Sequence, residues 1–142
     1  MIYFAVFQGL ENENQRFFNV DFHFPNNYPF SPPEVKYIAQ NRIRIHPNIY
    51  VNGKVCLSIL GTWSGPGWTT VMDITNVLLT IQSLLDNDPL CNEPGYEKRH
   101  WKTDEHANSY RTMIAYYNLC VAQFQMMEKT PPGFECFKEI ME

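Results

Sequence analysis

Apolar and polar residues alternate in the first third of the chain. The clearest run places an apolar residue at every second position, with polar residues between them: Phe18, Val20, Phe22 and Phe24. This is the two-residue period of a half-buried antiparallel strand, and residues 3–7 and 35–37 repeat it more weakly. The polar segment 11–15 predicts a hairpin loop, and the asparagines at 26–27 predict a turn. We therefore expect a meander of three or four strands.

After Cys56 the apolar spacing changes to three and four residues, which is the period of a helix. One series over 74–85 predicts a helix that ends before Asp86, with Thr69 or Thr70 available to cap its start. A second series over 110–127 predicts a helix with a broad apolar face.

Strands followed by helices predict an α+β layer fold. The 142 residues are enough for one domain with a real core. We divide this single domain, 1–142, into a strand-rich part at 1–56 and a helical part at 69–142, and a short further helix is expected near Phe134.

Charge and hydropathy narrow the classes of function. A formal charge of −4 and a pI near 5.5 provide no basic surface for phosphates, so nucleic acid is not expected as a partner. No apolar run approaches the ~20 residues of a membrane span, and the first residues lack the order of a secretory signal. We expect a cytoplasmic or nuclear protein that acts on a protein partner or a small substrate, with no membrane contact.

Cysteine and histidine spacing gives no metal or disulfide pattern. The cysteines at 56, 91, 120 and 136 contain no C-x-x-C pair, and the four histidines lack zinc-type spacing. We therefore expect neither a metal site nor a disulfide framework.

The segment 46–57 carries the clearest chemistry in the sequence. Asn48 stands eight residues before Cys56, and Asn52-Gly53 predicts a tight turn between them. A side-chain amide can stabilise an oxyanion and a thiol can act as a nucleophile. This spacing therefore allows a nucleophile and an oxyanion donor to be held together.

Four segments occur in a fixed order along the chain, and two of them lie within 46–57. They are Tyr28-Pro29-Phe30-Ser31-Pro32-Pro33-Glu34-Val35, His46-Pro47-Asn48, Gly53-Lys54-Val55-Cys56-Leu57 and the helical run 77–85. Their order and spacing resemble the signature of the ubiquitin-conjugating enzymes. Residues 56–63, Trp68 and 92–97 resemble most closely the divergent branch with ubiquitin-conjugating enzyme Z and the large hybrid conjugating enzyme-ligases.

The resemblance implies an antiparallel meander packed against a central helix and C-terminal helices. It also implies that Cys56 accepts ubiquitin, or a ubiquitin-like protein, from an activating enzyme as a thioester and passes it to a substrate lysine or a ubiquitin ligase. ATP is used by the activating enzyme, so no cofactor is expected here. For the other cysteines, Cys91, Cys120 and Cys136, we prefer a structural role.

The same resemblance assigns roles to the loop before Cys56. Asn48 is expected to stabilise the oxyanion, a contribution of about 10²–10³ in rate, although it also suits a role in closing the turn. The two roles can coexist. His46, Pro47 and Gly53 are assigned to the structure of the loop, with general-base catalysis by His46 not favoured.

Asp104 is the third candidate catalytic residue. It lies in a segment, Lys102-Thr103-Asp104-Glu105, that resembles the family's loop beside the cysteine, where an acidic residue acts on the acceptor lysine. The alternative is a carboxylate that complements the dipole at the start of a helix. Both interpretations stay open.

Two loops resemble the ligase-binding surface of the family: Tyr28, Pro29 and Phe30 form one, and Trp68 with its neighbours forms the other. Tyr28 and the prolines suit a turn at the sheet edge equally well, so Phe30 is the direct contact that we expect. The segment 63–67 resembles an insertion and predicts a loop above Cys56.

The chain departs from the family at its start. Members usually begin with an amphipathic helix that contacts the activating enzyme, whereas this sequence opens in the first strand at Ile2. We expect the first helix to be missing, either in a fragment or in a member that has lost charging. Two functions stay open: a thiol acyltransferase, or a non-catalytic module that binds ubiquitin or a ligase. A redox-sensing thiol is disfavoured because Lys54 is the only close cation in sequence.

Overall fold

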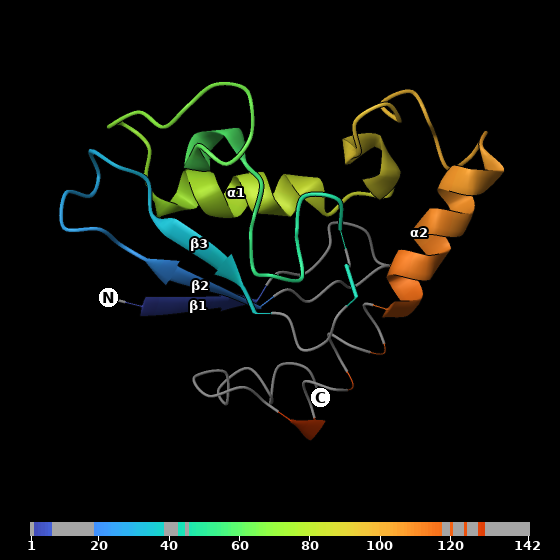
Figure 1. The fold of residues 1–142 in the computed structure, drawn as a ribbon, viewed down its shortest axis with the longest axis horizontal. Helices are drawn as coiled ribbons and strands as arrows, with labels where there is room; N and C mark the ends of the chain where they lie inside the picture. The colour runs from blue at the N-terminus through green and yellow to red at the C-terminus, as the bar shows by residue number, and fades with distance from the viewer. Residues whose placement is uncertain are drawn as a thin grey trace.

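The computed structural model of the protein describes residues 2–6, 19–38, 43–44, 46–117, 120, 124 and 128–129. Figure 1 shows a small sheet at one side, helix α1 along the middle and helix α2 at the far end. Strands come first and helices later in the chain, so the predicted α+β fold is confirmed.

The sheet is an antiparallel meander of three strands within the described residues, in the order β1-β2-β3. Strand β1 spans Ile2–Val6, β2 spans Asn19–His23 and β3 spans Glu34–Tyr37. Val20 and Phe22 of β2 are buried, as the alternation predicts, and their pairing partners on β3 are Tyr37 and Val35. Phe7, Phe18 and the predicted loop 11–15 lie outside the described residues.

Helix α1 spans Ile74–Leu84 and ends before Asp86, as predicted. Its predicted cap is wrong, because Asp73 caps the helix instead of Thr69 or Thr70. The Asp73 carboxylate accepts hydrogen bonds from the backbone of Thr75 at 2.8 Å and Asn76 at 3.3 Å, and the Asn76 side chain accepts from the Asp73 backbone at 2.9 Å. The two threonines lie too early in the chain to reach these N–H groups.

Helix α2 spans Glu105–Tyr117 and starts five residues earlier than the predicted 110–127 series. Asp104 explains the early start, because its side chain accepts hydrogen bonds from the first helical N–H groups. Ala107 and Ile114 are buried, whereas Met113 of the predicted apolar face is exposed. Most of the later part of the series, and the helix expected near Phe134, lie outside the described residues.

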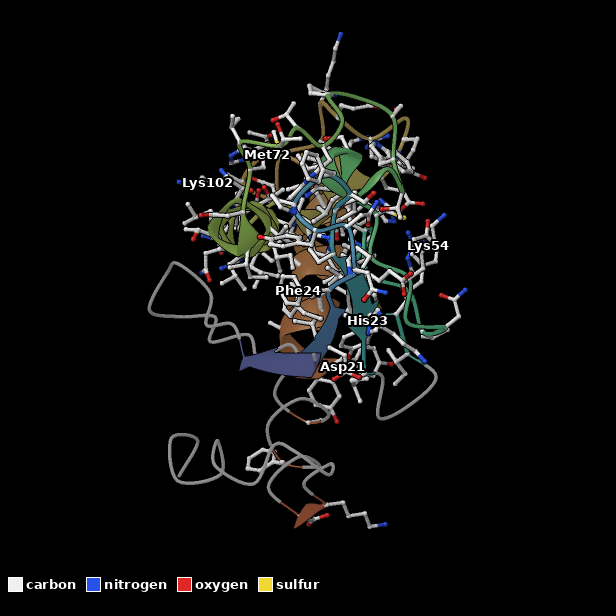
Figure 2. All side chains as sticks on the ribbon, turned by 90° about the vertical axis from the view of Figure 1, so that its left-hand side faces the viewer. Asp21, His23, Phe24, Lys54, Met72 and Lys102 are labelled. Carbon is white, nitrogen blue, oxygen red and sulfur yellow. The ribbon has the colours of Figure 1, made fainter. Side chains whose placement is uncertain are left out.

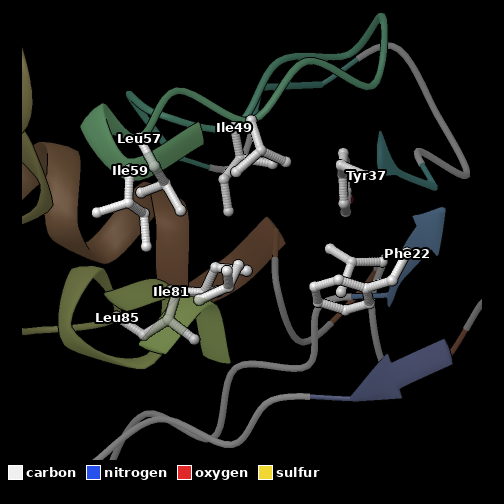
Figure 3. Close-up of a cluster of buried hydrophobic side chains, with 10 residues drawn as sticks. Phe22, Tyr37, Ile49, Leu57, Ile59, Ile81 and Leu85 are labelled. Carbon is white, nitrogen blue, oxygen red and sulfur yellow. The ribbon is translucent and has the colours of Figure 1, made fainter. Parts of the chain in front are cut away.

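One buried cluster joins the sheet, the segment around Cys56 and α1 (Figure 3). Its members are Val20, Phe22, Tyr37, Ile49, Val55, Leu57, Ile59, Val77, Ile81 and Leu85. Val77 and Ile81 lie four residues apart on one face of α1, and Leu85 directly follows the helix. The segment that carries Cys56 is therefore part of the core packing.

The lysines near Cys56 and near the start of α2 lie on two sides of the molecule. Lys54, in the turn before Cys56, and Lys102, before α2, lie on opposite sides in the view of Figure 2.

In the described ranges, no helix has the length and apolar character to cross a bilayer, and no group of three or more potential metal ligands is present. Cys56, Cys91 and Cys120 are free thiols, and Cys136 is not among the described residues.

The core should be most sensitive on the inner face of α1. Ile81→Ala removes a fully buried side chain, and we expect it to lower the free energy of unfolding by about 2–5 kcal/mol. Leu79→Ala, on the exposed face of the same helix, is the matched control and should change it by less than about 0.5 kcal/mol. Urea denaturation measures both, and equal losses would contradict this packing.

Candidate active site

Residues 46–56 form a tight hairpin that brings Asn48 and Cys56 together. Ile49 pairs with Val55, and the turn closes with a hydrogen bond from the Gly53 N–H to the Tyr50 carbonyl at 2.9 Å. The Cys56 N–H donates to the Asn48 carbonyl at 2.8 Å, and the Asn48 side-chain amide donates to the Cys56 carbonyl at 3.0 Å. The turn is present as predicted, and two hydrogen bonds join the two residues.

Gly53 allows this hairpin to lie against β3. Its φ is +91°, and a Cβ added to it would lie 2.8 Å from Lys36 Cγ and 3.1 Å from the Tyr37 carbonyl oxygen. The Tyr37 N–H donates to the Gly53 carbonyl at 2.8 Å. A side chain at this position would force the turn away from the sheet, so the geometry supports a structural role for Gly53.

His46 joins the hairpin to the end of α1. Its Nε2 lies 2.9 Å from the Leu84 carbonyl oxygen, and its Nδ1 accepts the Asn48 backbone N–H at 3.1 Å. Because a carbonyl only accepts, Nε2 must carry the proton and Nδ1 must be unprotonated. Both nitrogens of this fully buried imidazole are therefore used. The geometry supports the loop-organising role of His46 and leaves neither nitrogen free to act as a base. Pro47 is buried and continues the turn between His46 and Asn48.

Asn48 has a structural task in this arrangement. One of its two side-chain N–H groups holds the Cys56 carbonyl, so the turn-closing alternative is present. Its Oδ1 is buried and has no hydrogen-bond partner among the described residues. The amide is held beside the cysteine, and its action on an oxyanion stays a prediction.

Cys56 is 2% exposed and lies between two core residues, Val55 and Leu57. The hydroxyl of Thr62 fixes the backbone on both sides of it. Thr62 Oγ1 accepts the Leu57 N–H at 2.9 Å and donates to the Val55 carbonyl at 2.6 Å. No local motif in the sequence marks Thr62, because its role depends on the path of the loop.

The loop after Cys56 folds back on the residues beside it. Gly65, with φ +133°, lies so close to Ser58 that an added Cβ would be 3.0 Å from the Ser58 Cβ. Ser58 begins the short 3₁₀ helix η1, Ser58–Leu60, directly after the cysteine segment. The predicted loop at 63–67 is therefore packed next to this segment, with Trp63 partly exposed.

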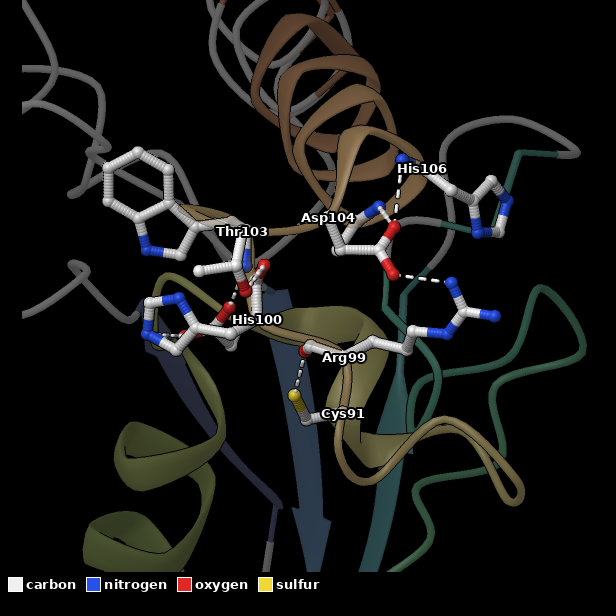
Figure 4. A network of polar contacts seen from close by, with 9 residues as sticks. Cys91, Arg99, His100, Thr103, Asp104 and His106 are labelled. Atoms are coloured by element: carbon white, nitrogen blue, oxygen red, sulfur yellow. Dashed lines mark hydrogen bonds and ion pairs between the residues drawn. The ribbon is translucent and has the colours of Figure 1, made fainter.

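Asp104 is fully engaged at the start of α2 (Figure 4). Its Oδ1 accepts the N–H groups of His106 at 2.9 Å and Ala107 at 3.1 Å, and its Oδ2 accepts a hydrogen bond from Arg99. The hydrogen bond from Arg99 is the main cause that lowers the pKa of Asp104, and the helix N–H groups add to it. Asp104 is therefore ionised at neutral pH, and the helix-terminus alternative is present. Its role toward a lysine stays a prediction.

The segment before α2 also contains Cys91, whose thiol donates to the Arg99 carbonyl at 2.6 Å (Figure 4). Desolvation raises the pKa of Cys91, and the charges of Asp88, Asp86 and Glu97 raise it further. A thiol that stays protonated is a poor nucleophile, which supports the structural role preferred for Cys91.

The two loops that resemble a ligase-binding surface lie together. The Trp68 indole donates to the Pro29 carbonyl at 2.7 Å, and the Tyr28 and Trp68 ring centroids lie 6.1 Å apart. Tyr28, Pro29 and Trp68 therefore have internal contacts. Phe30 is 76% exposed and Val71, after Trp68, is 90% exposed. Of the four predicted residues, Phe30 is the one that presents most of its surface to a partner.

Comparisons with known proteins agree on one family. Residues 12–118 match the family model described as "Ubiquitin-conjugating enzyme". Human ubiquitin-conjugating enzyme E2 Z is 43% identical over 128 residues, which cover 89% of this chain and 36% of that protein. Probable ubiquitin-conjugating enzyme E2 25 of Arabidopsis thaliana is 39% identical, over 92% of this chain and 22% of the relative. The human dual E2/E3 enzyme BIRC6 is 37% identical over 87% of this chain and 3% of its own length. The chain thus spans about a third of the length of human E2 Z.

Thr62 offers a test of the backbone around Cys56. Thr62→Val keeps the shape and removes the hydroxyl, which leaves the Leu57 N–H and the Val55 carbonyl without this partner. We expect a loss of about 1–3 kcal/mol in the free energy of unfolding, measured by urea denaturation. Thr62→Ser keeps the hydroxyl and should retain most of the stability, so a loss as large as that of Thr62→Val would contradict this role.

Asp104 predicts a pH-dependent stability. Its pKa is lowered in the folded state, so its ionised form stabilises the protein fully above the unfolded value of about 3.9, and this contribution is lost as pH falls through the folded value. Asp104→Asn keeps an oxygen for the helix N–H groups and removes the charge. Thermal unfolding should show wild type above the variant at pH 7, with a difference that shrinks below about pH 4. A difference that does not change with pH would contradict the Arg99 pairing.

Proposed function

The chain belongs to the ubiquitin-conjugating enzyme family, and from this premise we propose that Cys56 carries ubiquitin, or a ubiquitin-like protein, as a thioester. The Cys56 sulfur attacks the thioester carbonyl carbon of the modifier on an activating enzyme. A new carbon–sulfur bond forms, the old one breaks, and the thiol proton passes to the departing sulfur of the activating enzyme. ATP is used before this step by the activating enzyme, so the proposal needs no cofactor in this chain.

In the second step a lysine amine or a ligase thiol attacks the carbonyl carbon of the Cys56 thioester. Negative charge develops on the carbonyl oxygen, the carbon–sulfur bond to Cys56 breaks, and the nucleophile's proton returns the thiol to its starting form. A fixed amide N–H near that oxygen stabilises the transition state more than the ground state. We assign this task to the side chain of Asn48.

The pairing of Asn48 with Cys56 across one hairpin carries the proposal. The core already fixes the neighbours Val55 and Leu57, so the backbone at Cys56 does not depend on this amide alone. The hairpin is also bound to α1 through His46, which limits how far the amide can move. A donor with so little freedom loses little entropy when the oxyanion forms.

Partner contacts follow from the exposed side chain of Phe30. We propose that Phe30 contacts a ubiquitin ligase, while Tyr28, Pro29 and Trp68 hold the loop in place. Exposed aromatic residues on a supported loop are typical anchors of protein interfaces. Asp104 is proposed to lie toward the acceptor lysine, with its charge fixed by Arg99.

One observation favours a second function. Cys56 is 2% exposed, and a sulfur must be reached before it can attack a thioester. A module of this fold that binds ubiquitin or a ligase without forming a covalent bond would not require that access. Such a module would keep the Phe30 surface and make no use of the thiol.

A charging assay separates the two functions. The protein is mixed with an activating enzyme, ATP and ubiquitin, and products are resolved on a non-reducing gel. We expect an adduct that thiol reagents remove and that Cys56→Ala abolishes, because the bond requires the Cys56 sulfur. Cys91→Ala is the matched control and should still form the adduct. If wild type forms none while Cys56→Ala binds ubiquitin as well as wild type does, the binding module is supported instead.

A further inference from the structure

Arg44 contacts three groups around the hairpin. Its Nη2 donates to the Pro47 carbonyl and also to Glu93 Oε2 at 3.1 Å. Its guanidinium carbon lies 4.3 Å from the centroid of the Tyr50 ring, in cation–π geometry. Glu93 follows the short 3₁₀ helix η2, Pro89–Asn92, and stands 49 residues after Arg44. One side chain therefore connects the hairpin to the segment that leads toward α2.

The peptide bond between Pro47 and Asn48 is held at both of its polar ends. Arg44 donates a hydrogen bond to the Pro47 carbonyl oxygen, and His46 Nδ1 accepts one from the Asn48 N–H at 3.1 Å. A peptide unit is planar, so fixing its oxygen and its N–H fixes its orientation. The Asn48 Cα lies in that plane, and the direction in which the Asn48 side chain leaves the backbone depends on it.

The guanidinium suits this position better than an ammonium group would. Its Nη2 donates to both the carbonyl and the carboxylate, while the flat face of the group lies over the Tyr50 ring, and a compact ammonium has no such face. The side chains of Arg44 and Glu93 are each 35% exposed, so the pair is partly shielded from water. Glu93 thus anchors the same guanidinium nitrogen, Nη2, that donates to the Pro47 carbonyl.

We propose that Arg44, anchored by Glu93, is a positioning residue for the Asn48 amide in the transfer of the modifier to an amine. This inference rests on the proposed function, because it concerns the step in which an amine attacks the Cys56 thioester and its carbonyl oxygen becomes an oxyanion. Arg44 acts through the Pro47–Asn48 peptide and is not assigned a contact with the modifier. Formation of the thioester exchanges one thiol for another at the carbonyl, which is an easier step than attack by an amine, so we expect it to depend much less on this donor.

The test separates charging from discharge. Cys56 is loaded with ubiquitin, charging is stopped by chelating the magnesium that the activating enzyme needs, and free lysine is added. Arg44→Met keeps the length of the side chain and removes the guanidinium. We expect discharge to slow about ten- to a hundredfold, as for small displacements of a catalytic group, while charging proceeds at the wild-type rate. Arg44→Lys should also be slow, because an ammonium lacks the flat face that lies over the Tyr50 ring.

A matched variant controls for loss of any half-buried arginine. Arg111 stacks over the Trp101 ring at 4.3 Å on α2, so Arg111→Met makes the same chemical change at a different site. It should discharge at the wild-type rate. If Arg44→Met slows charging and discharge equally, or if Arg111→Met slows discharge as much, the positioning role is overturned.

Coupling to Asn48 provides the second readout. If Arg44 acts through Asn48, then Arg44→Met should cause no further slowing in an Asn48→Ala background. A purely structural contribution would slow that variant by the same factor as wild type. Additive effects would therefore overturn the inference.

A measurement on the uncharged protein keeps this inference separate from the proposed function. If wild type never forms the thioester, the proposed function fails, and amide hydrogen exchange still tests Arg44. In Arg44→Met the N–H groups of Asn48 and Cys56 should exchange faster, because their hydrogen bonds lie within the released loop. Those of β2 should not change. Unchanged protection at Asn48 and Cys56 would overturn the inference.

Discussion

The imidazole of His46 is the contact on which the rest of the site depends. It lies fully buried between the end of α1 and the hairpin, and each of its nitrogens has a polar partner. A buried polar group without partners costs free energy, so the two partners and the ring hold one another in place. Protonation would put an N–H at Nδ1 facing the Asn48 N–H. The loop geometry thus requires the neutral tautomer of His46. Through this ring, the end of α1 fixes the position of the hairpin.

The hydrophobic core includes the segment that carries Cys56. Val55 and Leu57 belong to the cluster that joins β2, β3 and α1, and Cys56 lies between them. Packing energy that stabilises the domain therefore also fixes the backbone of the candidate nucleophile. Thr62 adds a polar restraint to the same backbone, and Gly53 lets the turn approach β3 closely. Loosening the core would loosen the site.

Periodic features could be predicted from sequence, and contacts between distant residues could not. The alternation around Val20 and Phe22 locates β2, and the four-residue spacing locates α1, because both follow from which face is buried. The cap of α1 required a choice among neighbouring polar residues, and the geometry of the first turn selected Asp73. The link from Arg44 to Glu93 leaves no mark in the sequence, because it depends on how separate segments meet.

The covered state of Cys56 has a kinetic meaning. A thiol that reagents meet only in a rare open conformation reacts at its intrinsic rate multiplied by the open fraction. That factor is the same for an oxidant, an alkylating agent and a thioester donor, so burial alone protects without discriminating. Discrimination arises when one partner binds the open conformation more tightly and thereby raises its population. Selectivity at this thiol would then be determined by the surfaces that a partner contacts, which lie away from the sulfur.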